Sequence, residues 1–579
     1  MSKKTVGILV VLLLLLAPLG SVYASETFRM HTGVVINDKD AMDVLTLFAP
    51  GGEHTSWLIG NKGNVVHAWN LEDSIPISAA PTGPGDTAYF DGPQVQSVNA
   101  LGPGLHDRLL PNGNLLRGYR PDTYDYAPGA AVNNVDENFK VGYSPAGGTA
   151  GGVLELDWKN NLLWWYPLKD AMHIQHHTFY RVVDTSPYQG HTFILAWEYI
   201  DCATALAAGR TTCAGEAIYP DMIREVDANK NTVWEWHVWD HTTAVQTDAH
   251  KFFLDAQTTD HQPERDWTHG NTVEFNPVTD QVIINFRNWG EFFIIDHGAT
   301  YVDGDPAASI ALAATDAGDP IFRWGNPVNY GAGEGPEFNY DGDQELFGEH
   351  CVVWLGVDYQ NGYGPAGNVL IFDNGWNRPA GNRSRSVEMT PNGVGAAGVA
   401  VEADWLQPNS PLVWDFAPID ASAFYAHHQG GTGRVYTDPD DSNVFWTFVT
   451  STQMGALFQV KTDLNLLPGR TDTVVWDFIV PLIGADGKRL CYHDDGQRNT
   501  VHRAHQYLLD YPAFDGRKIE AQYAFSGNCT QYYDLWDSKV VAGGAEEAAP
   551  LTGWGFTGTG IGGGGGGGAA GGGGGGGGY

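Results

Sequence analysis

The chain has 579 residues, of which 68 are Asp or Glu and 32 are Lys or Arg, so its formal net charge is −36. This charge argues against nucleic acid and anionic membrane surfaces as partners, because both repel a negative protein. The length is large for one ordinary core and suits a repeat architecture.

The first residues have the pattern of an export signal. Lys3 and Lys4 precede an apolar run from Val6 to Pro18, and the small-residue motif Val22–Ala24 follows. The run is shorter than the roughly 20 apolar residues that span a bilayer. We predict a signal peptide over residues 1–24, export to the periplasm or the extracellular space, and no stable membrane insertion; an uncleaved anchor is the alternative.

The last residues, 546–579, are dominated by glycine and cannot bury apolar surface, so we predict a flexible tail there. The region between the ends, residues 25–545, is predicted to be one catalytic domain. An exported chain favours disulfides, and the cysteines close in sequence suggest a first pair. The candidate pairs are Cys202–Cys213 and Cys491–Cys529, with Cys351 left over as a buried small hydrophobe.

Two features each recur six times along the chain. The first is a histidine that stands upstream of a short β-type run, at steps of roughly 70 to 95 residues. The second is a β-type run that ends in an aromatic residue. Alternating apolar residues bounded by Asp, Asn and Gly turns indicate antiparallel hairpins. The histidines are His106, His176/His177, His269, His350, His427/His428 and His505; the aromatic ends are Trp69, Tyr166, Trp236, Trp324, Phe416 and Phe478.

This double repeat predicts an all-β fold, a six-bladed β-propeller, with Ala203–Ala208 as a weak helix candidate. The innermost strands of a propeller line its central channel, so the repeated histidines should form a ring there. Each unit exceeds the usual roughly 40 to 50 residues, so we expect long inter-strand insertions. A β-sandwich or several small β domains are the alternatives. The candidate insertions are Pro121–Pro145, Thr242–Pro263 and Tyr330–Phe347.

Several residues near the histidines could carry chemistry. His269 and Arg287 are predicted to lie on adjacent strands joined by the Asn276–Pro277 turn. A guanidinium inside an apolar strand is costly unless an anion meets it, and a structural salt bridge is the alternative to a role in function. Glu349 directly precedes His350 and could orient or polarise an imidazole. The tryptophans near these residues could stack on an aryl ring or pack in the core. They are Trp267, Trp289 and Trp354.

These residues resemble the bacterial arylsulfate sulfotransferases, a family of exported six-bladed propellers that needs no nucleotide sulfate donor. The likeness covers about residues 35–518. Its most specific stretches are Asp266–Asn271 with Arg287 after it, Phe322–Pro327, Glu349–His350 leading to Phe372–Gly375, and Val501–Ala504.

The resemblance implies transfer of a sulfuryl group from a phenolic sulfate ester to a phenolic acceptor through a covalent sulfohistidine, with ping-pong kinetics. His350 would be the nucleophile, and His269 and Arg287 would hold the sulfuryl oxygens. A further active-site histidine corresponds to His176 or His177, with His177 favoured. The residues expected to contact substrate are Asn271, Asn374, His428 and His505. No cofactor or metal is expected, and a homodimer is left open.

The chain also departs from the family pattern. Glu349 stands where Gln is expected, Cys351 where Asp or Asn is expected, and Thr178 where Asp is expected. These differences adjoin the candidate catalytic histidines and bear on the reactivity of their imidazoles, and so on the rate and the donor preference. Two rival functions remain: a metal-dependent enzyme that uses ring histidines as ligands, and a non-catalytic binding propeller.

Overall fold

A computed structural model describes most of the region between the two ends. The described residues are 30–51, 53, 55–70, 103–119, 148, 150–170, 172–213, 215–256, 266–357, 363–391, 412–417, 425–466, 471–483, 489–490, 492–493, 499–525, 531–534 and 539–542. The predicted signal peptide, the tail, the Cys491–Cys529 pair and the Pro121–Pro145 insertion lie outside them. Within these ranges no helix has both the length and the apolarity to cross a membrane.

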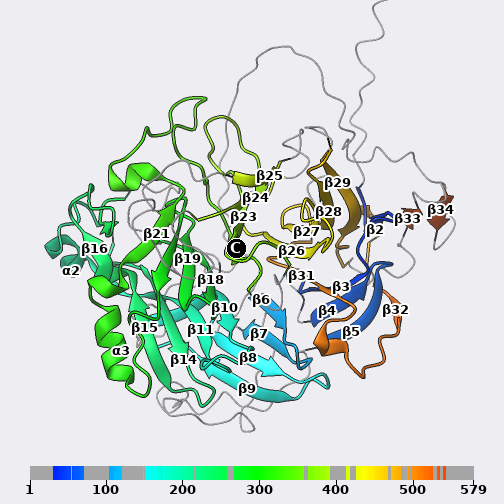
Figure 1. Cartoon of the computed structure of the whole chain (residues 1–579), viewed down its shortest axis with the longest axis horizontal. Coiled ribbons are helices and arrows are strands. Elements are labelled where there is room, and N and C mark those ends of the chain that lie inside the picture. Colours follow the sequence, from blue (N-terminus) through cyan, green and yellow to red (C-terminus); the bar gives the residue numbers. More distant parts are fainter. Residues whose placement is uncertain are drawn as a thin grey trace, which may run out of the picture.

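Six sheets, antiparallel except for the β2–β33 pair of the sixth, stand around a common axis, which confirms the predicted six-bladed propeller (Figure 1). We number the blades in chain order and give their strands from the axis outwards. Blade 1 comprises β31 (His505–Leu508), β3 (Val44–Phe48), β4 (Thr55–Gly60), β5 (Asn64–Asn70) and β32 (Tyr523–Ala524). Blade 2 comprises β6 (Pro103–Leu109), β7 (Leu115–Tyr119), β8 (Gly152–Leu156) and β9 (Leu162–Pro167). Blade 3 comprises β10 (His173–Arg181), β11 (Thr192–Glu198), β14 (Asp221–Val226) and β15 (Thr232–His237).

The other three blades complete the ring. Blade 4 comprises β18 (Gly270–Asn276), β19 (Gln281–Phe286), β20 (Glu291–Asp296) and β21 (Pro320–Trp324). Blade 5 comprises β22 (Cys351–Trp354), β23 (Val369–Asp373), β24 (Arg385–Met389) and β25 (Leu412–Phe416). Blade 6 comprises β26 (Gly431–Thr437), β27 (Val444–Ser451), β28 (Ala456–Asp463), β29 (Asp472–Ile479), β2 (Gly33–Asn37), β33 (Gln531–Asp534) and β34 (Lys539–Ala542).

The two ends of the described chain close the ring by exchanging strands. The early strand β2 pairs with β29 and extends blade 6 outwards, with Val34 opposite Phe478. The late strand β31 pairs with β3 and supplies the innermost strand of blade 1, with Leu47 opposite His505. Strand exchange of this kind connects the two ends of the chain to the first and last blades and so closes the ring.

Both sequence repeats map onto fixed places in the blades. The aromatic ends lie on the fourth strand of each blade, and the histidines lie on or shortly before the innermost strand. The three candidate channel tryptophans are fully buried in the apolar clusters instead: Trp267 and Trp289 in one, Trp354 in another. They act as packing residues there.

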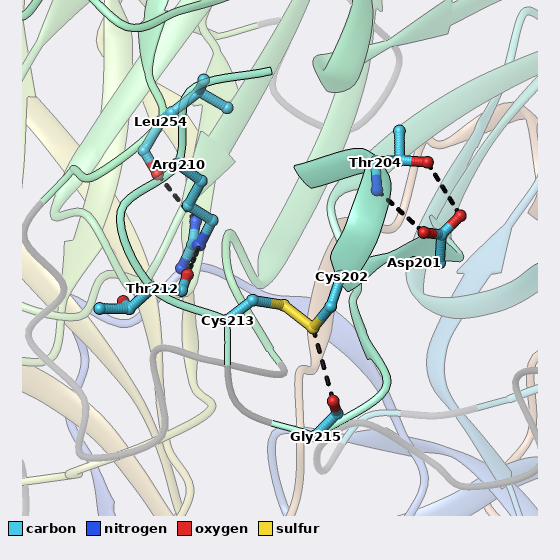
Figure 2. The surroundings of a disulfide bond; sticks show 8 residues. All are labelled: Asp201, Cys202, Thr204, Arg210, Thr212, Cys213, Gly215 and Leu254. Atoms are coloured by element: carbon cyan, nitrogen blue, oxygen red, sulfur yellow. Dashed lines mark hydrogen bonds between the residues drawn. A yellow bond between two sulfur atoms is a disulfide. The ribbon is translucent and has the colours of Figure 1, made fainter. Parts of the chain in front are cut away.

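Short elements occupy the connections. The predicted helix forms as α2 (Cys202–Ala207), capped by Asp201, whose carboxylate accepts from the Thr204 N–H. The disulfide Cys202–Cys213 joins its start to the following loop, with 5.6 Å between the Cα atoms (Figure 2). A second helix, α3 (Pro306–Ala313), was not predicted. The remaining elements are β1 (Met30–His31), β12 (Ile200–Asp201), β13 (Ala217–Ile218), η3 (Val238–His241), β16 (Thr242–Thr243), β17 (Phe252–Phe253), η4 (Asp316–Gly318), η5 (Pro327–Tyr330), β30 (Tyr492–His493) and η7 (Pro512–Phe514).

Candidate active site

Equivalent hairpins in two neighbouring blades bring their ends to the same side of the axis. His269 directly precedes β18 and Arg287 directly follows β19, and the Arg287 N–H donates to the His269 carbonyl at 3.2 Å. In the next blade His350 directly precedes β22 and Asn374 directly follows β23. Antiparallel pairing therefore places an imidazole beside a second polar side chain in each blade.

Three imidazoles from three successive blades meet at this end. The ring centroids are 4.8 Å apart for His177 and His269, 6.4 Å for His177 and His350, and 6.3 Å for His269 and His350. One ring nitrogen from each lies within 4.8 Å of the others. All three side chains are buried. We call this group the three-imidazole cluster.

Two members of the cluster reach the axis on unusual backbone. His177 has φ of 46° and His269 has φ of 55°, both in the left-handed region that L residues seldom adopt. The pairing register of each inner strand also shifts here, between Gln175 and Phe179 and between Gly270 and Val273. Bulges of this kind re-aim side chains and are enriched next to active sites.

Each ring of the cluster is held through its Nδ1 atom. His269 Nδ1 hydrogen-bonds to Asp266 Oδ2, and His177 Nδ1 lies 2.8 Å from His176 Nδ1. His350 Nδ1 lies 2.9 Å from Asn374 Oδ1 and 3.0 Å from the Gly348 carbonyl. Because Nδ1 of each ring already has a hydrogen-bonding partner, Nε2 is the nitrogen that remains to interact with a molecule bound at the centre of the cluster.

The tautomer of His350 follows from its neighbours. The Asn374 amide nitrogen donates to the carbonyls of Ala426 and Gln429, at 2.7 Å each, so its oxygen is the atom turned to the imidazole. Both partners of His350 Nδ1 are then acceptors, and Nδ1 must carry the proton. Burial, followed by the positive charge of Arg287, holds the pKa of His350 well below its usual value. His350 is therefore neutral, with an unprotonated Nε2.

Arg287 supplies the positive charge beside the cluster. Its guanidinium carbon lies 4.8 Å from the Trp376 ring centroid, and Nη1 donates to Asn288 Oδ1 at 3.0 Å. Burial is the largest cause and Arg287 a further cause of the lowered pKa of His427 and of His428. The guanidinium is thus near the buried His350 and also near the less buried His427 and His428.

The remaining predicted contacts fall in different places. His428 lies in hydrogen-bonding reach of the Gln453 amide at 2.9 Å, and the pKa of His428 is lowered to about 3. Asn271 donates to the Glu349 carbonyl at 3.1 Å, so it supports the chain that leads into β22. His505 lies next to His106, 5.2 Å between ring centroids, in a separate group with Arg108. The roles assigned to these residues stay predictions.

The residue before His350 does not act on its ring in the way suggested by the sequence. The Glu349 carboxyl accepts from the Asn285 amide at 3.2 Å, and burial raises the pKa of Glu349 well above its usual value. Glu349 is thus a buried neutral acid. The neighbouring Cys351 thiol is also buried, faces the Thr432 carbonyl at 3.5 Å, and has a raised pKa.

Some residues at the site were not singled out from the sequence. His502 lies 5.8 Å from His177 between ring centroids, and Arg503 donates to the His350 carbonyl and, at 3.2 Å, to Thr272 Oγ1. Both belong to the stretch Val501–Ala504, which carried part of the family likeness. Asp221 contacts His176 and Asp266 contacts His269. Asp266 begins the stretch Asp266–Asn271 of the family likeness but was given no role of its own, and Asp221 had no sequence signal.

Comparison with known proteins gives one informative match. Residues 203–404, which include His269, Arg287 and His350, match the family model described as Arylsulfotransferase (ASST). No curated protein matched the sequence. Similar solved structures include a protein from Lactobacillus plantarum (8% identity, TM-score 0.33, 80% of this chain and 99% of that one). A second is the periplasmic gluconolactonase of Pseudomonas aeruginosa (9% identity, TM-score 0.31, 80% and 96%). Likeness at this level carries no functional argument.

Proposed function

Over residues 203–404 the chain belongs to the arylsulfotransferase family, and from this premise we propose that the protein moves a sulfuryl group from a phenolic sulfate ester to a phenolic acceptor. The observation that carries the proposal is the fixed tautomer of His350. A buried neutral imidazole with Nδ1–H bound to Asn374 and Gly348 presents an unprotonated Nε2. Such a nitrogen is a competent nucleophile near neutral pH.

In the first half-reaction His350 Nε2 attacks sulfur. The N–S bond forms, the bond from sulfur to the aryl oxygen breaks, and a sulfohistidine and a phenolate result; the phenolate then takes up a proton. The three sulfuryl oxygens carry negative charge in the transition state, and fixed cationic donors stabilise such charge. The nearness of Arg287 and His269, at the two ends of one hairpin, to His350 supports this role for them.

In the second half-reaction an acceptor phenol gives up its proton, its oxygen forms a bond to the sulfur of the sulfohistidine, the N–S bond breaks, and neutral His350 is regenerated. The same donors again stabilise the negative charge on the three sulfuryl oxygens, because this step is the reverse of the first. The chemistry resembles phosphoryl transfer, in which positioning and electrostatics do most of the work. This scheme needs no cofactor and gives ping-pong kinetics.

The direct test uses 4-nitrophenyl sulfate with and without phenol. Wild type should release nitrophenol continuously with phenol present, and in a burst of about one equivalent per enzyme without it. The peptide that contains His350 should then carry one added sulfuryl group by mass spectrometry. His350→Ala should be inactive, while His173→Ala, on the same strand as His177 but bonded to Asp170, should match wild type.

Turnover by His350→Ala at the wild-type rate would overturn the proposal and favour a different enzyme or a binding propeller. Purified protein that neither turns over the ester nor forms a labelled peptide would do the same. Export stays a proposal, and fractionation of cells that express the full chain checks it.

A metal-dependent enzyme is the second candidate, because the three-imidazole cluster offers three nitrogens within 4.8 Å. Against it stands the positive charge of Arg287, which acts on His350 in the same cluster. Elemental analysis of purified protein, and assays with and without a chelator, separate the two. Activity that is proportional to bound metal would favour the second candidate.

A further inference from the structure

Asp221, His176 and His177 form a row of three side chains in contact, and His177 is the member that belongs to the three-imidazole cluster. His176 is fully buried, its Nδ1 lies 2.8 Å from His177 Nδ1, and its Nε2 lies 2.8 Å from Asp221 Oδ1. A carboxylate, an imidazole and a second imidazole therefore follow one another. Because Nδ1 of His177 is used in this contact, its Nε2 is the nitrogen that can exchange a proton with the substrate.

The row is built rigidly. Asp221 accepts hydrogen bonds from the Gly270 N–H at 2.8 Å and from the Thr268 hydroxyl. His176 stacks on Trp197, with 3.8 Å between ring centroids and 17° between the ring planes. Neither the carboxylate nor the ring of His176 can turn away without losing these contacts.

The contact between two Nδ1 atoms fixes how protons are distributed. A hydrogen bond between them needs one proton, carried by either ring. If His177 carries it, His177 Nε2 is bare. If His176 carries it, His177 Nε2 can hold a proton while His177 stays neutral, and the positive charge then lies on His176 beside Asp221.

The cationic form belongs on His176 for a physical reason. Burial lowers the pKa of both rings, but for His176 the carboxylate of Asp221 acts against burial, whereas His177 is surrounded by other imidazoles and its pKa is held well below the usual value. The other titratable groups that act on His176 are His269 and Asp266. A proton on the pair is therefore better held next to Asp221.

We propose that Asp221, His176 and His177 form a proton relay that protonates the departing phenolate and later accepts the proton of the acceptor phenol. This proposal rests on the proposed sulfuryl transfer. His177 is the acid at the substrate, and His176 and Asp221 are positioning residues that act through it.

The proton balance of the first half-reaction is as follows. As the bond from sulfur to the aryl oxygen breaks, that oxygen takes the Nε2 proton of His177. The proton between the rings moves from His176 Nδ1 to His177 Nδ1. His176 keeps its Nε2 proton, this nitrogen stays in contact with Asp221, and both rings end neutral. The second half-reaction reverses each step with the proton of the acceptor.

The test compares two donors that differ in leaving group. Phenol has a pKa of about 10, like the tyrosine side chain, and its anion needs protonation as it leaves. The nitrophenolate ion is a better leaving group and needs this help less. For wild type and His176→Gln we would measure kcat/KM for phenyl sulfate and for 4-nitrophenyl sulfate. In ping-pong kinetics kcat/KM of the donor reports the first half-reaction alone, and the donor ratio is the quotient of the two values.

Loss of a general acid costs roughly 10²- to 10⁴-fold where it is needed. His176→Gln should therefore lower kcat/KM for phenyl sulfate about a hundredfold or more, and that for 4-nitrophenyl sulfate less than about tenfold. A merely structural role lowers both values equally. A change of less than tenfold in their ratio overturns the relay.

Asp221→Asn, which can still accept from Gly270, gives a second measurement and decides the question if His176→Gln does not fold by circular dichroism. His173→Gln, three residues upstream of His176, is the matched control and should leave the ratio unchanged. If His350→Ala is active, the proposed transfer itself fails. If His350→Ala is inactive while the donor ratio of His176→Gln equals that of wild type, only the relay fails.

Discussion

Asn374 Oδ1 lies 2.9 Å from His350 Nδ1, and the amide of Asn374 is locked in this orientation by two backbone carbonyls. A flipped amide would place its NH₂ group against Nδ1–H and its oxygen against the carbonyls. One asparagine thus decides which nitrogen of the candidate nucleophile is free. Without a nucleotide donor or a metal in the scheme, this hydrogen bond is central to the reactivity of His350.

Asn374→Ala should lower kcat about 10- to 100-fold, the range found for groups that orient a ligating imidazole. The Gly348 carbonyl remains as a partner of Nδ1, so the loss should be incomplete. Steady-state kinetics with 4-nitrophenyl sulfate and phenol measure it. An unchanged kcat would mean that Gly348 alone fixes the tautomer.

Arg287→Lys keeps the charge but loses the planar fork that can hold two sulfuryl oxygens at once. Removal of one fixed donor from a transition-state site costs about 10²- to 10³-fold in kcat. We expect kcat to fall by at least about a hundredfold, with a smaller change in KM. A variant in which KM rises and kcat does not change would show that Arg287 only binds substrate.

The close approach of the backbone to His177 gives a steric test. A Cβ atom at Gly148 would stand 2.0 Å from His177 Cε1. Gly148→Ala should therefore displace the ring and lower kcat/KM about a hundredfold, as misplacement by about 1 Å can do. Gly304→Ala is the control: that residue also has positive φ but has nothing within 4 Å of the added atom. Equal activity losses in the two variants would contradict steric displacement.

The blades could be predicted because their signal is local. Alternating strands, turn residues and the aromatic end of each fourth strand recur along the sequence. The helix α3 was missed although Asp305 and Pro306 form an ordinary helix start, because no apolar periodicity accompanied them. Local sequence patterns were thus sufficient to predict the sheets but not the short helix α3 between two strands of blade 4.

The site was only partly predictable, for geometrical reasons. Adjacent strand residues normally point to opposite faces, so sequence offered a choice between His176 and His177. The left-handed backbone at His177 instead lines the two rings up behind one another. Likewise His505 was chosen for blade 1, whereas His502, just before the strand, is the ring beside His177. The spacing of the histidines along the sequence predicts neither the backbone conformation at His177 nor the contact with Asp221, which is distant in sequence.

Glu349→Gln tests the departure from the family pattern. A protonated Glu has nearly the shape of Gln, and burial keeps the pKa of Glu349 far above its usual value. The substitution should therefore leave kcat and its pH profile close to those of wild type. If Glu349 polarised an imidazole as a carboxylate, kcat would fall and the pH profile would shift, which the same assay would detect.

A buried charge network between blades 3 and 4 should make stability depend on pH. His297 is fully buried, its Nδ1 lies 2.6 Å from Asp280 and its Nε2 lies 3.0 Å from Glu225. Burial alone would lower the pKa of His297, but the hydrogen bonds to Asp280 and Glu225 raise it to about 9. The folded protein therefore holds this proton more tightly than the unfolded chain, whose histidines have a pKa of about 6.5.

The sign of the effect follows from this difference. The stabilisation is fully present below about pH 6.5 and is lost as pH rises through about 9, on the order of 3 kcal/mol in all. The free energy of unfolding, from urea titrations between pH 6 and pH 10, should fall over this window. His297→Gln should be less stable at pH 6 and show a flatter slope. Some slope should remain, because Glu198 and Glu235 outweigh burial and raise the pKa of His237 to about 10. An equal slope in variant and wild type would rule out His297 as its source.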